Sequence, residues 1–422
     1  MKQSGRRFLV RAMPVLAAFA LAAPLRAQGL PRAAPESLGF SPERLGRLDE
    51  ALARDVEGGE IAGTVALVAR GGRIVHVFLS GYQDLERRIP VRENTIFRIA
   101  SFSKAVTSVA ALVLVEEGRL VLSDPVSKYV PAFRETMVAG PGGLVRAKRE
   151  ITVRDLLAHT AGLSYGAGPA AEAWKAAGLK GWWFGHRPEP LSALVDRIAA
   201  LPIDAQPGEK WVYGVSHDVL GRVIEVASGQ PLDRFLAARV FGPVGMPDTS
   251  FFVPKEKAGR LATVYTRDGS RLVPAPDGPS GPGAFVDGPR MCLGGGAGLV
   301  STALDYARFL QMLLNGGILD GVRVLAPRTV ATMTSNHAGA LYEDGRLGFG
   351  FGFEVVEDPG RAGRVSVPGE FAWGSGYDGG YLVDPRDGVL ALYLAQRVPE
   401  RGPRQRRVFS ALVYQSIVGA AP

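Results

Sequence analysis

Apolar segments with the character of β-strands occur at both ends of the chain. They are rich in β-branched residues and are bounded by Gly, Pro, Asp or Arg, which is the pattern of strands and turns. Arg70-Gly71-Gly72-Arg73 joins the first two segments and has the composition of a hairpin turn. The predicted strands are residues 64–68, 74–79, 349–355, 380–383 and 389–395.

Between these ends, the apolar positions recur with the period of a helix and alternate with Gly- and Pro-rich loops. The most extreme loop covers residues 271–298. Strands at both ends and helices between them predict an α/β (α+β) fold, in which both termini form one antiparallel sheet flanked by helices, with a large helical insertion. We expect a site between the two parts. The predicted helices are residues 153–159, 218–228, 232–240, 303–314 and 407–418, and one that begins at Pro42 with Ser41 as N-cap.

The longest apolar run of the interior, residues 105–115, follows Ser101-Phe102-Ser103-Lys104. A helix here is apolar almost all round and should be buried. The three-residue spacing places Ser101 and Lys104 on one face. Desolvation disfavours a charged lysine, and a neutral lysine beside a serine hydroxyl can activate it as a nucleophile. The N-terminus of a helix also favours an oxyanion.

This tetrad alone does not establish a catalytic site. A serine at a helix start and a lysine that extends to solvent give the same pattern. The interpretation therefore depends on what else the chain contains.

Residues 1–27 have the organisation of an export signal rather than of a folded domain. A basic segment precedes an apolar run of twelve residues, 12–23, which is too short to span a bilayer. Leu25-Arg26-Ala27 is a plausible cleavage tripeptide, which predicts a periplasmic or secreted protein that starts near Gln28. A retained membrane anchor is the alternative. After cleavage we expect no stable membrane span.

The charge and the cysteine content narrow the possible functions. Removing residues 1–27 lowers the formal net charge from +8 to +3, so the basicity does not indicate nucleic-acid binding. The single cysteine, Cys292, cannot form an internal disulfide and is expected to be a packing residue. The five histidines lack metal-binding spacing, and we expect neither a metal nor a cofactor.

Two further segments carry candidate chemistry. Tyr213 lies in a loop just before a predicted helix, where a phenol can relay protons, although a tyrosine at the edge of the core is the simpler interpretation. Phe371-Ala372-Trp373-Gly374-Ser375-Gly376 reads as a strand with small residues that allow a ligand or backbone to approach. If this is an edge strand, it can supply an N–H group of an oxyanion hole.

In this order, S-x-x-K, the tyrosine motif and the Trp-Gly strand resemble the serine β-lactamase and penicillin-binding superfamily. The chain is most similar to class C β-lactamases and to the related family VIII carboxylesterases. Connecting phrases at residues 151–163 and 295–302 also match. The resemblance covers residues 35–420 and implies a β-lactamase-like fold. The expected sheet subdomain is 28–120 plus 346–422 and the mainly helical subdomain is 121–345, both within one domain, 28–422.

The resemblance also implies roles for individual residues. Ser101 is the acylated nucleophile, Lys104 its partner, and Tyr213 the general base. The N–H groups of Ser101 and Gly376 would form the oxyanion hole. The substrate-binding positions that the resemblance implies are Val215, Trp373, Gly374 and Ser375.

Two departures favour an esterase over a β-lactamase. Tyr213-Gly214-Val215 stands where the β-lactamases have Tyr-x-Asn, and Trp373-Gly374-Ser375 where they have Lys/His-Thr/Ser-Gly. The charge that recognises the β-lactam carboxylate is therefore expected to be absent. We expect a carboxylesterase that acts on small or mid-sized acyl esters. The alternatives are a β-lactamase or D,D-peptidase and a non-catalytic sensor.

The roles of two further segments stay open. Gly162-Leu163-Ser164-Tyr165-Gly166 fits the nucleophile-elbow pattern, but no strand is predicted before Ser164. Trp182, Trp183 and Phe184 either form an apolar wall of the pocket or cover the core.

Overall fold

The computed structural model describes residues 29–275 and 285–420. Its main sheet has eight strands, all neighbours being antiparallel. In their order across the sheet they are β12 (Gly348–Phe349), β13 (Glu354–Val355), β14 (Phe371–Ser375), β15 (Gly379–Asp384), β16 (Val389–Leu394), β1 (Gly63–Arg70), β2 (Arg73–Asp84) and β3 (Ile89–Pro90).

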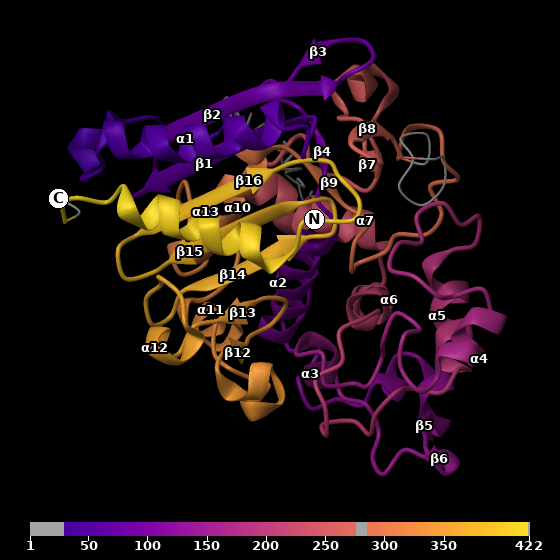
Figure 1. Ribbon diagram of the computed structural model, residues 1–422. Coiled ribbons are helices and arrows are strands. Elements are labelled where there is room, and N and C mark those ends of the chain that lie inside the picture. Colours follow the sequence, from indigo (N-terminus) through magenta and orange to yellow (C-terminus); the bar gives the residue numbers. More distant parts are fainter. Residues whose placement is uncertain (1–28, 276–284, 421–422) are drawn as a thin grey trace, which may run out of the picture.

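Strands from the two ends of the chain meet at β1, which pairs with β2 on one side and with β16 on the other. In Figure 1 the indigo and yellow strands lie side by side. The prediction of one antiparallel sheet from both termini is confirmed. Four small two-stranded sheets accompany it: β4 (Phe97–Arg98) with β9 (Val300–Ser301), β5 (Met137–Gly140) with β6 (Gly143–Arg146), β7 (Tyr265–Asp268) with β8 (Arg271–Pro274), and β10 (Ile318–Leu319) with β11 (Val322–Arg323).

The helices lie on both faces of the sheet, and the magenta part of the chain occupies the lower right of Figure 1. The α-helices are α1 (Pro42–Glu57), α2 (Ser103–Glu116), α3 (Val153–Leu157), α4 (Ala171–Ala176), α5 (Leu191–Ala199), α6 (Ser216–Ser228), α7 (Leu232–Leu236), α8 (Gly242–Val244), α10 (Ala303–Leu314), α11 (Pro327–Met333), α12 (Pro359–Ala362) and α13 (Pro403–Gln415). A π-helical turn, η5 (Ala237–Phe241), follows α7.

Alternating side chains of the central strands face two separate cores. Ala66 and Val68 of β1 join the cluster that contains residues of α1 and α13. Val65 and Leu67 join the main cluster, which contains residues of α2 and α10. Both faces of the sheet are therefore buried, and α1 and α13 pack side by side on one of them.

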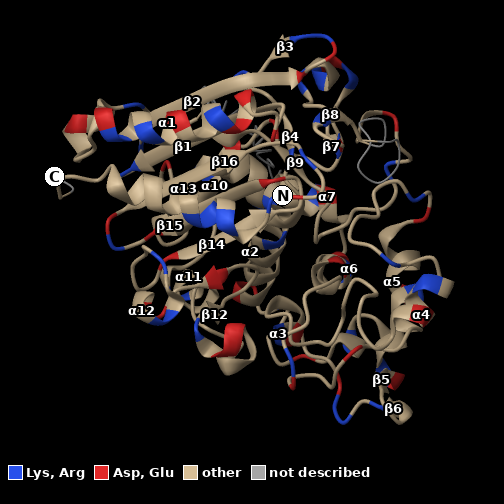
Figure 2. Ribbon diagram, viewed as in Figure 1, with Lys and Arg blue, Asp and Glu red and all other residues tan. Residues whose placement is uncertain are grey.

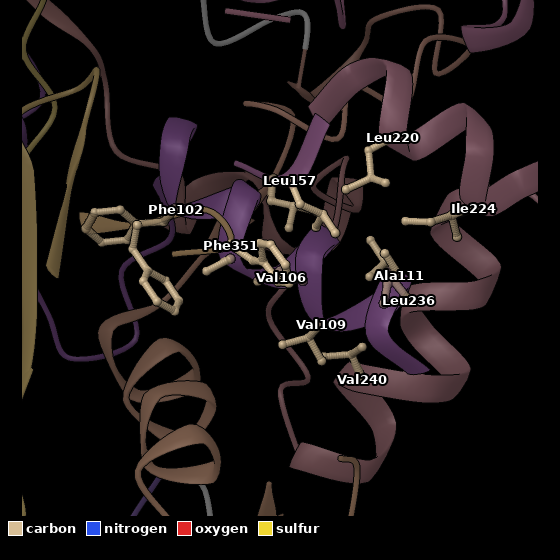
Figure 3. Packing of buried hydrophobic residues seen from close by; sticks show 14 of the residues in the cluster. Phe102, Val106, Val109, Ala111, Leu157, Leu220, Ile224, Leu236, Val240 and Phe351 are labelled. Atoms are coloured by element: carbon tan, nitrogen blue, oxygen red, sulfur yellow. The ribbon is translucent and has the colours of Figure 1, made fainter. Parts of the chain in front are cut away.

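Helix α2 forms the centre of the main core. All its side chains from Ser103 to Leu114 are buried, as the apolar pattern predicted. In Figure 3, Val106, Val109 and Ala111 point toward side chains from α3, α6, α7 and η5. Each fully buried valine of this set contributes about 1.5–3 kcal/mol. The tetrad is thereby attached to the most deeply packed element of the main core.

The structure also corrects some boundaries. The predicted strand 349–355 is wrong: β12 and β13 are two short strands joined by a turn, in which Gly352 adopts φ 97° and Gly350 N–H donates to the Phe353 carbonyl. The helix predicted at 232–240 ends at Leu236 and continues as the π-helical η5.

The predicted subdomain boundaries stay a prediction. α10, assigned from the sequence to the helical part, packs against β16 and β1 of the sheet. The predicted export signal lies outside the described residues.

Candidate active site

Ser101 lies in a 3-10 turn, η2 (Ala100–Phe102), that leads directly into α2. Ala100, immediately before it, adopts φ 40°, a left-handed conformation that costs a non-glycine residue free energy. The chain reaches this turn from β4, whose Arg98 pairs with Val300 of β9. The serine is thus placed at the head of the buried helix by a strained turn with paired backbone on its N-terminal side.

The Ser101 hydroxyl accepts two hydrogen bonds from groups that can exchange protons. Tyr213 OH donates to Ser101 Oγ at 2.7 Å, and Lys104 Nζ donates to it at 3.2 Å. Trp373 Nε1–H donates to the Tyr213 oxygen at 3.2 Å. The structure therefore brings Ser101, Lys104, Tyr213 and Trp373 together, although the sequence spreads them over more than 270 positions.

Lys104 is fully buried, and neighbouring oxygen atoms hold its ammonium group. Besides Ser101, Nζ donates to Tyr165 OH at 3.1 Å and to the Gly296 carbonyl at 2.8 Å. It also lies 4.7 Å from the centre of the Tyr213 ring. Burial raises the pKa of Tyr165 well above its ordinary value, so Tyr165 stays protonated.

The Gly295-Gly296 segment, whose Gly296 carbonyl accepts from Lys104, is itself held by hydrogen bonds and close packing. Asp218 Oδ1 accepts from Gly296 N–H at 3.1 Å, and Thr107 Oγ1 donates to the Gly295 carbonyl at 2.8 Å. A Cβ on Gly295 would lie 2.4 Å from the His217 carbonyl, so only glycine fits. Burial raises the pKa of Asp218 to about 6, and Lys104 acts in the opposite direction.

Tyr213 is held by aromatic rings and by a close backbone contact. Its ring lies 4.7 Å from His159 and stacks at 5.6 Å on Trp211. Burial, together with His217 and Lys104, keeps the pKa of His159 well below its ordinary value, so this imidazole is neutral. A Cβ on Gly214 would lie 2.2 Å from the Leu163 carbonyl, so the loop passes here only with a glycine.

Trp373, Gly374 and Ser375 belong to β14, and Gly376 follows directly. β14 pairs with β13 only at Phe371 and Ala372, so its second half is a free edge on that side, as the sequence suggested. Gly376 lies close to the nucleophile turn, because a Cβ on it would be 3.8 Å from Ala100 Cβ. Within the described residues its N–H donates no hydrogen bond.

A pocket of about 630 Å³ opens over these groups, a volume typical of sites for small molecules. Residues from both predicted subdomains line it. They are Ser101, Tyr165, Trp182, Tyr213, Thr266, Ala275, Trp373, Gly374, Ser375, Gly376, Val398, Pro399, Glu400 and Arg406.

The structure does not bring Val215 to this pocket. Val215 is fully buried in the main core, because it directly precedes α6 and its side chain turns inward with that helix. Its assignment as a substrate-binding residue is therefore corrected.

The structure also places the aromatic residues 182–184, Ser164 and Cys292. Trp182 lines the pocket, whereas Trp183 stacks on Phe285 at 4.9 Å and Phe184 belongs to the main core. Ser164 is buried and accepts a hydrogen bond from Gly166 N–H. Cys292 is buried, and burial raises the pKa of its thiol to about 12.

Tyr165, Glu400 and Arg406 are among the site residues that the sequence reasoning missed. Tyr165 occurs inside the rejected elbow pattern, and no local feature connects it to Lys104. Glu400 and Arg406 follow the last strand and precede or begin the closing helix. Their place at the pocket depends on how that helix packs across the sheet.

In residues 29–275 and 285–420, no group of three or more His, Cys, Asp or Glu side chains is arranged to hold a metal ion. Within the same ranges, no helix has the length and apolar character needed to cross a bilayer.

Comparison with known proteins gives consistent matches over most of the chain. Residues 48–415 match the Beta-lactamase family. Protein Rv1367c of Mycobacterium tuberculosis is 36% identical over 375 residues, which cover 83% of this chain and 90% of that protein. Esterase EstB of Burkholderia gladioli is 34% identical over 373 residues, covering 84% and 91%.

Among solved structures, EstCE1, described as a hydrolase with promiscuous acyltransferase activity, is 29% identical. It superposes with a TM-score of 0.77 over 88% of this chain and 98% of its own. Simvastatin synthase (LovD) of Aspergillus terreus is 24% identical with a TM-score of 0.75 over 89% and 98%, and shows the fold alone. The chain therefore belongs to the beta-lactamase family, within the superfamily of serine β-lactamases and penicillin-binding proteins, and is a serine hydrolase.

Proposed function

We propose that this protein is an exported carboxylesterase that cleaves small or mid-sized acyl esters through an acyl-enzyme on Ser101. The observation that carries the proposal is the contact of Ser101 Oγ with both Tyr213 OH and Lys104 Nζ beneath a largely apolar pocket. The names of two relatives, an esterase and a hydrolase, support it. The proposal of export rests on residues 1–27 alone.

The geometry supports a two-step reaction. In acylation, Ser101 Oγ bonds to the ester carbon while its proton passes to the Tyr213 oxygen, and this proton then goes to the departing alkoxide. In this step Tyr213 acts as its phenolate, whose oxygen accepts from the Trp373 N–H and takes the proton of the neighbouring Ser101 hydroxyl. In deacylation, Tyr213 takes a proton from water, the resulting hydroxide attacks the acyl carbon, and Ser101 recovers its proton.

The carbonyl oxygen gains negative charge in both steps. We propose that the N–H groups of Ser101 and Gly376 stabilise it. The position of Gly376 beside Ala100 supports this role, as does the dipole of α2, whose positive end faces Ser101.

One observation favours a second candidate, a β-lactamase or D,D-peptidase. A Salmonella typhimurium protein provisionally named a D-alanyl-D-alanine carboxypeptidase is 30% identical over 80% of this chain. Two departures argue against it. Gly214-Val215 lacks the amide that contacts a β-lactam side chain, and Trp373 leaves β14 itself without a cation.

A kinetic comparison separates these functions. We expect wild-type enzyme to hydrolyse 4-nitrophenyl acetate and butyrate and to turn over nitrocefin far more slowly. Ser101→Ala should lower ester turnover by about a thousandfold or more. Equal ester rates for Ser101→Ala and wild type would reject the esterase proposal. Nitrocefin turnover close to ester turnover would favour the second candidate.

A further inference from the structure

The catalytic pocket contains a positive charge that does not come from β14. Of its described lining residues, only Glu400 and Arg406 carry formal side-chain charges. Arg406 belongs to the first turns of α13, where Figure 2 shows basic residues along the helix. We expected the pocket to lack a positive charge that recognises a carboxylate. This holds for β14, but the pocket as a whole contains Arg406.

Two glycines create the space for the Arg406 side chain. Gly374 of β14 and Gly380 of β15 are cross-strand partners. A Cβ on Gly374 would lie 2.5 Å from Arg406 Nη1, and one on Gly380 would lie 3.0 Å from its Cγ. Neither glycine has positive φ, so the backbone itself does not require them. Because they have no side chains, the guanidinium can lie directly on the strand that lines the pocket with Ser101.

In the free enzyme, the guanidinium has one exchangeable counter-ion. Arg406 Nη1 donates to Glu400 Oε2 at 3.1 Å, and the two side chains are 30% and 38% exposed. Burial raises the pKa of Glu400 despite the neighbouring Arg406, so this position does not favour the ionised form of Glu400 over that in water. A substrate carboxylate can therefore replace Glu400 at low cost.

Other acidic groups near Arg406 are engaged elsewhere. A separate cavity of about 120 Å³ is also lined by Arg406, together with Glu343, Glu354 and Glu370. Glu343 pairs with Arg346, and the other two carboxylates pair with Arg364. On the pocket side, Glu400 is the carboxylate that contacts Arg406 among the described residues.

We propose that Arg406 forms a carboxylate subsite, so that the enzyme favours esters that carry a second, anionic carboxylate. The planar guanidinium can hold a carboxylate by two parallel hydrogen bonds. Glu400 occupies the subsite in the free enzyme and gives way on binding. This inference rests on the proposed esterase function and names its substrate class.

Matched ester pairs test the subsite on both sides of the scissile bond. In the first pair, 4-nitrophenyl hydrogen glutarate carries the carboxylate in its acyl part and 4-nitrophenyl butyrate is the neutral counterpart. In the second pair, 4-acetoxybenzoate carries it in the alcohol part and phenyl acetate is the neutral counterpart. The readout is the ratio of kcat/KM between the anionic and the neutral ester of each pair.

We expect Arg406→Met to lower this ratio by about 10- to 100-fold in at least one pair, the effect of a lost charged hydrogen bond. Arg406→Lys should recover part of the loss, and Glu400→Gln should raise the ratio. Arg404→Met is the matched control, because Arg404 is exposed on the same helix and does not line the pocket. Its ratio should equal that of wild type.

Unchanged ratios for Arg406→Met in both pairs would overturn the inference while leaving the esterase function intact. An equal drop for Arg404→Met would also overturn it, since the effect would then be long-range charge alone. If wild type hydrolyses no ester of either kind, the proposed function fails and the subsite falls with it.

Discussion

Ser101 Oγ contacts two groups with different proton chemistry, a phenol and an ammonium, and each of these has further partners. Lys104 is tied to Tyr165 and Gly296, while Tyr213 is tied to Trp373. These contacts fix the direction of each donor before a substrate arrives. Preorganised donors of this kind stabilise developing charge without a reorganisation cost during the reaction.

Trp373 gives a test of this arrangement at the level of one hydrogen bond. Trp373→Phe removes the N–H that reaches the Tyr213 oxygen and keeps an aromatic ring in the pocket wall. We expect kcat for neutral esters to fall about tenfold, the usual effect of one lost hydrogen bond to a charged group. Stopped-flow or steady-state release of 4-nitrophenolate measures it.

The same substitution at Trp182 is the control. Trp182 lines the pocket and packs on Tyr377, without a hydrogen bond to Ser101, Lys104 or Tyr213. Equal losses of kcat for Trp373→Phe and Trp182→Phe would show that the pocket wall, and not the N–H, matters.

At the scale of elements, the nucleophile turn depends on segments far from it in sequence. β4 leads into the turn and pairs with β9. Ser250 forms a bridge to Val300 of β9, and the loop before Ser250 is anchored to the start of α10. The anchor is Asp305, whose Oδ2 accepts from Asp248 N–H at 2.8 Å and from Thr249 Oγ1 at 2.9 Å. A buried carboxylate thus joins α10 to the strand that positions Ser101.

The Asp305 carboxylate makes this anchor sensitive to pH. Burial raises its pKa to about 6 in the folded protein. Between about pH 4 and pH 6 the unfolded chain has lost this proton while the folded protein retains it, so stability falls as pH rises through that window. We expect Asp305→Asn, which keeps the acceptor oxygen, to lose less free energy of unfolding between pH 4.5 and pH 7 than wild type does.

Urea unfolding at these two pH values measures the difference. Asp218, whose pKa is also raised to about 6, contributes with the same sign in both proteins. The exposed Asp268 provides the control substitution, which should follow wild type. A steeper fall in Asp305→Asn than in wild type would contradict the assignment.

At the scale of the whole molecule, several features of the structure follow from local patterns in the sequence. The contact of Ser101 with Lys104 follows from three-residue spacing in a helical turn, and α10 covers the predicted residues. The sheet from both termini follows from strand patterns at both ends. These features require no knowledge of tertiary contacts.

The remaining features depend on contacts that have no local signal. The third ligand of the Lys104 ammonium, Gly296, lies 192 positions away. Arg406 lies over Gly374 and Gly380, which only the register of β14 with β15 places opposite each other. The helical period likewise does not predict that the Val215 side chain is buried in the core.

The central claim is that Ser101 carries the acyl group. It is tested most directly by quenching the wild-type enzyme during turnover of 4-nitrophenyl butyrate and measuring its intact mass, followed by mapping of the modified peptide. We predict one butyryl group, located on Ser101, and none in Ser101→Ala. A butyryl group on Ser164 or another residue, or acylation that persists in Ser101→Ala, would contradict the account.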